Sequence, residues 1–156
     1  MTGSMKTLAR PDCRAEILRR LRTVRPDAAP RWGRMSAHQM VCHLADACRM
    51  ATGERTVTRA TGPLPPAVMK LIALYLPLPW PAGIPTRPEL DQHCGGTQPV
   101  DFDRDLAEAE ALLNALTTRE IGVAWPSHPL FGGMTRADWL RWGYIHTAHH
   151  LRQFVA

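Results

Sequence analysis

The sequence predicts an all-α protein, a four-helix bundle with a long proline-rich crossover that contains a short extra helix. Apolar residues recur at helical spacing in four long segments, and two of these segments begin with a capping pattern. No segment shows the alternation of apolar and polar residues that is typical of a β-strand. The chain of 156 residues has the length of one domain, so we expect a single domain over residues 1–156.

The first helix is expected from about Asp12 to Val24. Asp12 is a suitable N-cap residue, because its carboxylate can accept from free backbone N–H groups of the first turn. Ile17 and Leu21 then recur at helical spacing. Pro26 ends the helix, since the residue before a proline avoids helical dihedral angles.

The second helix has the clearest start signal in the chain. Ser36 and Gln39 stand three residues apart and form a capping box, in which each side chain binds the other residue's backbone N–H. The expected inward face consists of Met40, Leu44, Ala47, Cys48 and Ala51. Gly53 is expected to end the helix.

Residues 56–99 are rich in proline, and only Ala67 to Leu76 has a helical pattern. Leu64 to Trp80 is the most apolar stretch, but prolines and Lys70 interrupt it. Its uninterrupted part would rise only about 15 Å as a helix, about half of a bilayer's hydrocarbon core. We therefore expect no membrane span here, but a short, largely buried helix within a long crossover.

Two further long helices complete the predicted bundle. The third is expected from about Asp103 to Leu116, with an inward face made of Leu106, Leu112, Leu113 and Leu116. The fourth is expected to begin at Thr135 as N-cap, with Asp138 at the third position of another capping pattern, and to run to the chain end. Its Trp139 and Trp142 are expected to pack inward.

Charge and cysteine usage exclude several classes of protein. The net charge of +5 is carried almost wholly by arginine, and the densest cluster is Arg14, Arg19, Arg20, Arg22 and Arg25. This cluster lies on or beside one early helix and is interpreted as a solvated face, so no nucleic-acid partner is expected. The four cysteines form no CxxC pair, and the N-terminus lacks the pattern of a signal peptide. We expect a cytoplasmic protein without a membrane partner.

Three of the seven histidines fall within five residues near the C-terminus. His146 and His150 are four residues apart on the predicted helix, so both imidazoles can point at one metal ion. His149 lies about 100° around the helix from His150 and cannot share that ion equally well. His146 could pair with His149 instead, because a spacing of three also brings side chains together.

A metal site of this kind needs a third ligand from elsewhere, and His43 is the best candidate because it lies mid-helix in an apolar segment. Gln39 and Asp46 share its helix stripe and could hydrogen-bond to its ring and orient it toward the ion. The remaining histidines are expected to be solvated (His38) or to serve as a conditional fourth ligand (His93 or His128). Spacing alone leaves open that all of them are hydrogen-bonded core residues without a metal.

Two segments resemble the DinB-like (YfiT-like) superfamily of metal-binding four-helix bundles, in a branch of domains of unknown function. Residues 32–44 read WGRMSAHQMVCHL, similar to the start of the second helix in that branch. Residues 128–135 read HPLFGGMT and residues 146–154 read HTAHHLRQF, which with Trp139 between them resemble its ending. In that family a histidine of the second helix and the first and last histidines of HxxHH bind the metal. The resemblance therefore implies His43, His146 and His150 as ligands, with His149 outside the set.

The resemblance also implies a divalent metal ion, foremost Zn or Ni, and a homodimer. Residues 149–153 read HHLRQ, whereas many thiol-transferring members read HHRGQ at these positions. Thiol-transferase activity therefore does not follow from the resemblance. The expected activity remains that of a hydrolase or thiol S-transferase acting on a small molecule such as a low-molecular-weight thiol, because three imidazoles leave a position open on the ion. Asp46 is the only nearby carboxylate that could act as a base. The alternative is a bundle protein that binds a metal or small molecule without turnover.

Overall fold

A computed structural model describes residues 5–120 and 122–154 of the chain. These residues form five α-helices and one 3-10 helix, and the described part contains no strand. The elements are α1 (Pro11–Leu21), α2 (Ala37–Thr52), α3 (Pro66–Tyr75), η1 (Pro88–Leu90), α4 (Phe102–Thr118) and α5 (Arg136–Gln153). An isolated bridge between His128 and Gly132 is the one β-type pairing in this part of the chain. The prediction of an all-α fold is confirmed.

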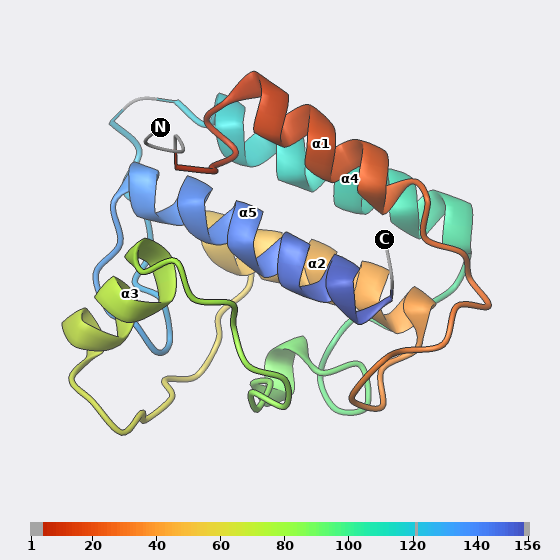
Figure 1. The fold of residues 1–156 in the computed structure, drawn as a ribbon, viewed down its shortest axis with the longest axis horizontal. Coiled ribbons are helices and arrows are strands. Elements are labelled where there is room, and N and C mark those ends of the chain that lie inside the picture. The colour runs from red at the N-terminus through yellow and green to blue at the C-terminus, as the bar shows by residue number, and fades with distance from the viewer. Residues whose placement is uncertain (1–4, 121, 155–156) are drawn as a thin grey trace.

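The four longer helices α1, α2, α4 and α5 pack lengthwise along one another (Figure 1). α2 and α4 run in the same direction: His38 contacts Asp105 near the two N-terminal ends, and Arg119 donates to the Thr52 carbonyl near the two C-terminal ends. Neighbouring helices that run parallel need a long return connection between them. Residues 56–99 supply that connection, which explains in physical terms why the crossover is long.

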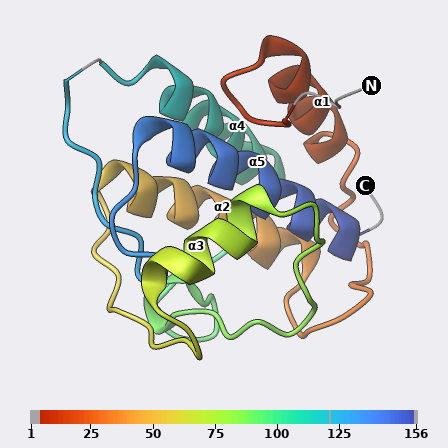
Figure 2. The same ribbon diagram turned by 60° about the vertical axis from the view of Figure 1, so that its left-hand side comes forward.

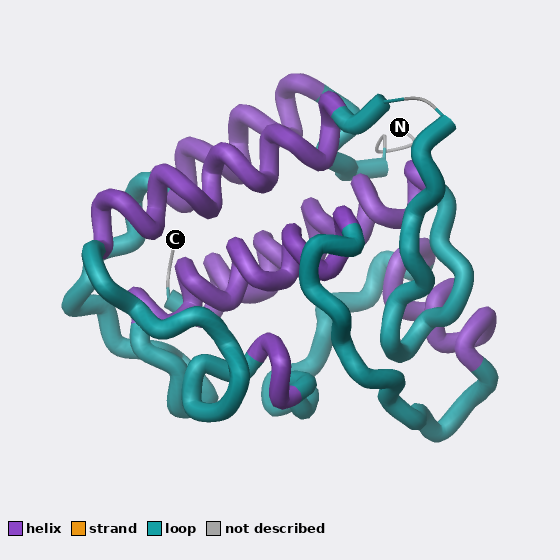
Figure 3. Tube along the Cα trace, turned by 180° about the vertical axis from the view of Figure 1, so that it is seen from behind, coloured by secondary structure: helices purple, strands orange, loops and turns teal. Residues whose placement is uncertain are grey.

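The crossover lies on one side of α2 and α5, while α1 and α4 lie on the other (Figures 1 and 3). The central pair α2 and α5 is therefore covered on both sides. Between the helices lies the core, whose largest fully buried side chains include Leu8, Ile17, Leu21, Met40, Leu44, Leu113, Leu116, Trp139, Leu140 and Leu151. The inward faces expected for α2 and for the tryptophans of α5 are confirmed.

Local sequence determines the start of both central helices as expected. The Ser36 hydroxyl accepts from Gln39 N at 3.0 Å, and the Gln39 amide oxygen accepts from Ser36 N at 2.9 Å. Thr135 and Asp138 make the same reciprocal pair at the start of α5. α2 ends at Gly53, whose φ of 85° is a left-handed value that glycine adopts without strain.

The other two long helices differ from the prediction at their ends. α1 begins at Pro11 and ends at Leu21, so Asp12 lies in its first turn rather than at the N-cap. The Asp12 carboxylate accepts from the Arg10 guanidinium. α4 begins earlier than expected, because the Asp101 side chain caps it by accepting from Arg104 N at 2.8 Å.

The short helix α3 is exposed, and the expectation that it is largely buried is wrong. Leu74 is its one buried residue, whereas Leu71 is 56% exposed. Figure 2 shows α3 lying across the outside of the central helices, where only one of its faces can pack. It is held there by polar contacts, because Lys70 and Tyr75 both bind the Asp138 carboxylate at the start of α5. Among the described residues, no helix has the length and apolar character needed to cross a bilayer.

Candidate metal centre

Three histidine rings converge between α2 and α5, on the side of these helices that faces the crossover. The Nε2 atoms of His43 and His146 lie 3.1 Å apart, and one ring nitrogen of each of His43, His146 and His150 lies within 4.8 Å of the other two. Two nitrogens bound to one zinc ion at 2.0–2.1 Å would be 3.1 Å apart at an angle of roughly 100°. The separation of His43 and His146 therefore fits a shared ion without rearrangement.

The second ring nitrogen of His43 and of His150 is held by an oxygen acceptor. His43 Nδ1 donates to the Leu90 carbonyl at 2.9 Å, and His150 Nδ1 donates to the Gln153 side-chain oxygen at 2.9 Å. The Gln153 amide in turn donates to the Trp32 carbonyl at 2.8 Å, which leaves its oxygen facing His150. Because a carbonyl oxygen only accepts, both rings carry their proton on Nδ1 and present the lone pair of Nε2 to the centre.

His146 is oriented by stacking rather than by a carbonyl. Its ring lies on the Trp142 ring, with centroids 4.6 Å apart and planes 10° apart. Trp142 is one turn earlier on α5, so the two rings share one helix face. This contact holds the His146 ring toward the other two histidines while part of its surface stays open to a cavity.

Burial keeps the three rings neutral. Loss of solvation lowers the pKa of His43, and it lowers the pKa values of His146 and His150 further below the ordinary value, with the neighbouring rings adding to the effect. Neutral imidazole is the form that donates a lone pair to a metal ion. Near neutral pH the centre therefore offers up to three nitrogen lone pairs to a metal ion and contains no positively charged ring.

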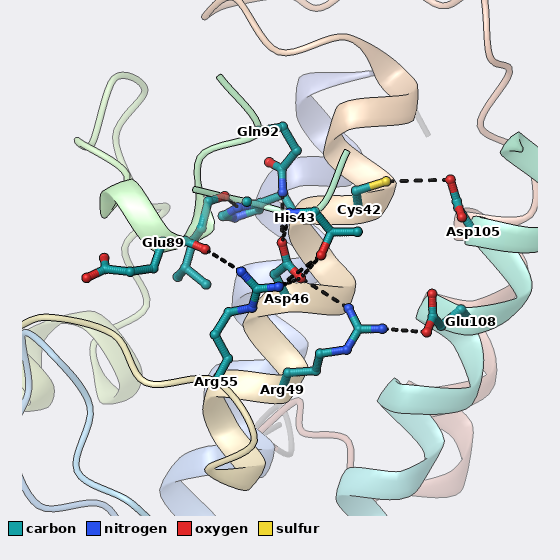
Figure 4. A network of polar contacts seen from close by, with 12 residues as sticks. Cys42, His43, Asp46, Arg49, Arg55, Glu89, Gln92, Asp105 and Glu108 are labelled. Carbon is teal, nitrogen blue, oxygen red and sulfur yellow. Dashed lines mark hydrogen bonds and ion pairs between the residues drawn. The ribbon is translucent and has the colours of Figure 1, made fainter. Parts of the chain in front are cut away.

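The structure corrects the expected roles of Gln39 and Asp46 as direct partners of His43. The Gln39 side chain is occupied by the capping box, and the Leu90 carbonyl takes the place beside the His43 ring. Asp46 is fully buried and already saturated (Figure 4). Its carboxylate accepts from Gln92 at 3.0 Å, from Thr97 N at 2.8 Å and Thr97 Oγ1 at 2.7 Å, and pairs with Arg49 at 3.1 Å and Arg55 at 3.0 Å. It is therefore not free to act as a base.

Asp46 instead positions His43 indirectly, through the crossover. Gln92 follows Leu90 by two residues, so its bond to Asp46 holds the segment that presents the Leu90 carbonyl. Arg55, itself paired with Asp46, donates to the Glu89 carbonyl at 2.9 Å and strengthens the same attachment (Figure 4). No periodic pattern in the sequence could have identified these contacts, because the crossover partners lie outside the long helices.

A cavity of about 160 Å³ opens beside the three histidines. Its walls are mainly apolar and include Trp80, Leu130, Phe131 and Trp142. Arg87 contributes the one guanidinium, and no carboxylate lies among the described residues that line the cavity. A cavity of about this volume can take a group the size of benzene. The crossover thus forms one wall of the candidate site.

The other histidines lie outside the cluster of three. His149 is buried beside the rings of Trp32 and Trp80, its Nδ1 has no partner, and burial lowers its pKa to about 4. His128 lines the cavity, but its Nδ1 accepts from the backbone N–H groups of Leu130 and Phe131, so its proton is on Nε2 and neither nitrogen is free for a metal. His93 is exposed and lines a separate depression. His38 is not simply solvated as expected, because it binds Asp105 at 2.7 Å.

Comparison with known proteins identifies a family but no characterised relative. The model of a family described as "Protein of unknown function (DUF1569)" matches residues 14–156, which include all three histidines of the cluster. No curated protein and no solved structure matches the chain.

Proposed function

We propose that this chain, which belongs to the DUF1569 family of proteins of unknown function, is a metal-dependent enzyme that binds one divalent ion through His43, His146 and His150. The convergence of the three neutral rings carries the proposal. In two of the rings the nitrogen that faces away from the centre donates to an oxygen, as histidine ligands in metal sites usually do. We further propose that the four long helices are a bundle of the DinB-like type, as the two sequence motifs imply.

The donor set is suited to zinc or nickel. Imidazole nitrogen is a borderline donor that favours Zn, Ni, Cu or Fe over Mg or Ca, and of these we propose Zn or Ni. Three protein ligands leave at least one position for water or substrate, as in catalytic zinc sites. An ion so bound would lower the pKa of a coordinated water or thiol and polarise a carbonyl group.

The residues around the histidines favour thiol transfer over hydrolysis. No carboxylate lines the described cavity, and Asp46 is fully paired, so no acidic side chain is placed to act as a general base toward a water molecule. Transfer of a thiol does not require such a base, because a metal-bound thiol is already deprotonated. The apolar walls would exclude water and hold an apolar electrophile of about one ring in size. A low-molecular-weight thiol is the proposed co-substrate.

Metal analysis of protein purified without a histidine tag tests the binding step. We expect at least one ion per chain in the wild type, and one ion fewer per chain in His43→Ala and in His146→Ala. His93→Ala is the matched control, because His93 is exposed and outside the cluster. Wild-type protein that binds no zinc or nickel after dialysis against either ion would refute the proposal.

Turnover is tested separately. The metal-loaded and the chelator-treated proteins are mixed with a small thiol and a panel of aromatic and aliphatic electrophiles, and thiol consumption is followed. Metal-dependent consumption that disappears in His146→Ala is the expected result. Ester and amide substrates, with release of acid as the readout, test the hydrolase form of the proposal in the same way.

The absence of a carboxylate base in the described cavity also favours a second candidate, a bundle protein that binds a metal or small molecule without turnover. Stoichiometric metal together with ligand-induced changes in tryptophan fluorescence, but without consumption of any substrate, would select this candidate. The proposed homodimer is tested on the same preparations by light scattering.

A further inference from the structure

A second group of potential metal donors lies between α2 and α4, away from the three histidines. His38 and Cys42 are four residues apart on α2 and therefore lie on one face, one turn apart. Asp105 in the first turn of α4 faces them, and one donor atom from each of the three lies within 4.8 Å of the others. Figure 4 shows Cys42 pointing toward Asp105, on a different side of α2 from His43. The group is thus separate from the proposed active centre.

The distances are close to those that a small ion would require. Asp105 Oδ2 lies 2.7 Å from His38 Nε2 and 3.7 Å from Cys42 Sγ. With bonds of about 2.0 Å to oxygen and 2.3 Å to sulfur, a separation of 3.7 Å corresponds to an angle of roughly 120° at a zinc ion. The nitrogen and oxygen would have to separate by roughly 0.6 Å to reach a tetrahedral angle. A change of this size is within reach of side-chain rotation.

The charge balance of Asp105 provides an independent reason to expect a cation. Its side chain is only 13% exposed, and among the described ion pairs its one partner is His38, which is charged only when protonated. The comparable carboxylates have permanent cations: Asp46 pairs with Arg49 and Arg55, and Asp138 pairs with Lys70. A carboxylate that is largely removed from water is stabilised by a paired cation or a metal ion.

We propose that His38, Cys42 and Asp105 form a second divalent-metal site, of the class that takes Zn²⁺ and similar ions. Thiolate and imidazole donors select zinc-like ions over Mg²⁺ and Ca²⁺, and the two negative ligands balance the charge of the ion. On binding, the Cys42 thiol releases its proton to solvent. The His38 ring moves its proton from Nε2 to Nδ1, so that Nε2 can donate its lone pair. One proton is therefore released per ion bound at this site.

The site would connect the N-terminal ends of two parallel helices. His38 is 21% and Asp105 13% exposed at the side chain, so an ion can enter from solvent and keep a water molecule as a further ligand. Cys42 is buried and lies adjacent to His43 in the sequence. An ion here would hold the first turns of α2 against α4 and stabilise the helix that carries one ligand of the proposed active centre.

Cobalt binding distinguishes this site from the three histidines, because a thiolate bound to Co²⁺ adds a charge-transfer absorption in the near ultraviolet that imidazole ligands do not produce. The experiment uses reduced, chelator-treated, untagged protein titrated with Co²⁺, with bound metal measured by equilibrium dialysis. In His146→Ala, which disables the histidine cluster, we expect one Co²⁺ per chain and the thiolate absorption. Adding Cys42→Ala should abolish both.

Cys48→Ala is the matched control, because Cys48 is also a buried cysteine of α2 but belongs to neither donor group. It should keep the absorption. Asp105→Asn retains the thiol and one acceptor oxygen at the helix start. It should weaken Co²⁺ binding at least tenfold in the His146→Ala background, which covers the case that Cys42→Ala does not fold. The proposal is overturned if His146→Ala shows no thiolate absorption, or if Cys42→Ala and Cys48→Ala behave alike. If the wild type instead binds a single ion with this absorption, the second site stands and the proposed histidine centre fails.

Discussion

Replacing Asp46 by Asn tests whether the buried carboxylate holds the crossover against α2. The change preserves shape but removes the charge opposite Arg49 and Arg55, whose side chains are only 19% and 25% exposed. It also puts an amide N–H₂ group where the carboxylate accepts from Gln92 and Thr97. Breaking a buried ion pair by removing one partner costs about 3–5 kcal/mol, because the remaining charge loses its compensation.

We therefore expect the free energy of unfolding of the metal-free protein to fall by about 3–5 kcal/mol in Asp46→Asn. For a chain of this size the midpoint of thermal unfolding would drop by roughly 6–20 °C. Urea unfolding followed by circular dichroism measures the difference. The matched control is Asp27→Asn, because Asp27 also pairs with an arginine, Arg25, but both side chains are exposed and the pair should add nothing measurable.

The same variant also reports on the metal centre. If Asp46 positions the Leu90 carbonyl, its loss should weaken metal binding by about 10–100-fold, as the loss of groups that orient metal ligands does elsewhere. Competition with a chromophoric chelator measures this affinity. An Asp46→Asn protein that unfolds within about 1 kcal/mol of the wild type would refute the account of the buried network. Unchanged metal affinity in a destabilised variant would refute only the link from Asp46 to His43.

Three further predictions concern the contacts around the site. Gln153→Met removes the oxygen that accepts from His150 Nδ1 and should weaken metal binding about 10–100-fold, measured by chelator competition. Gly96→Ala should lower the free energy of unfolding by about 1–3 kcal/mol in urea titrations, because an added Cβ would lie 2.6 Å from the Gln92 amide nitrogen and 2.9 Å from backbone. His128→Asn should make the stability of the metal-free protein less dependent on pH between about pH 6.5 and pH 4, measured by urea unfolding at several pH values. Burial lowers the pKa of His128 to about 3, so the unfolded chain binds a proton that the folded chain does not, and the wild type loses up to about 1.4 kcal/mol per pH unit through this ring as the pH falls.

Each of these predictions has a result that contradicts it. Arg152→Met is the control for Gln153→Met, since Arg152 is an exposed neighbour, and equal affinities in the two variants would show that the contact to His150 does not matter. An alanine at position 96 that leaves unfolding unchanged would show that the loop adapts freely. A pH dependence as steep in His128→Asn as in the wild type would mean that His128 is not the neutral, buried ring described above.

Much of the fold could be predicted because its signals are local. A capping box joins residues three apart, so Ser36 with Gln39 and Thr135 with Asp138 mark the starts of the central helices from the sequence alone. The spacing of His146 and His150 likewise follows from the helical repeat, and it places the two rings on one face. The third histidine, His43, was a candidate because it lies mid-helix in an apolar segment, and the resemblance supported it. No local rule connects position 43 with position 146.

The exposure of α3 could not be predicted, because an apolar segment does not reveal how many of its faces find a partner. Leu71 and Leu74 both have mainly apolar neighbours in the sequence, yet of the two only Leu74 is buried against the core. The direction of α4 relative to α2 decides this, since the long return between two parallel helices must cross the outside of the molecule. That direction is a property of the packing and of no single segment.

The sequence by itself determined where the helices start and which histidines can share a helix face, because capping and helical periodicity act over three or four residues. The tertiary structure decided which groups hold those histidines: the Leu90 carbonyl for His43 and the Gln153–Trp32 contact for His150. It also assigned Asp46 to the crossover rather than to the His43 ring. These contacts join residues 3 to 121 positions apart, and two of them use backbone carbonyls, which every residue type carries, so only the folded chain selects them.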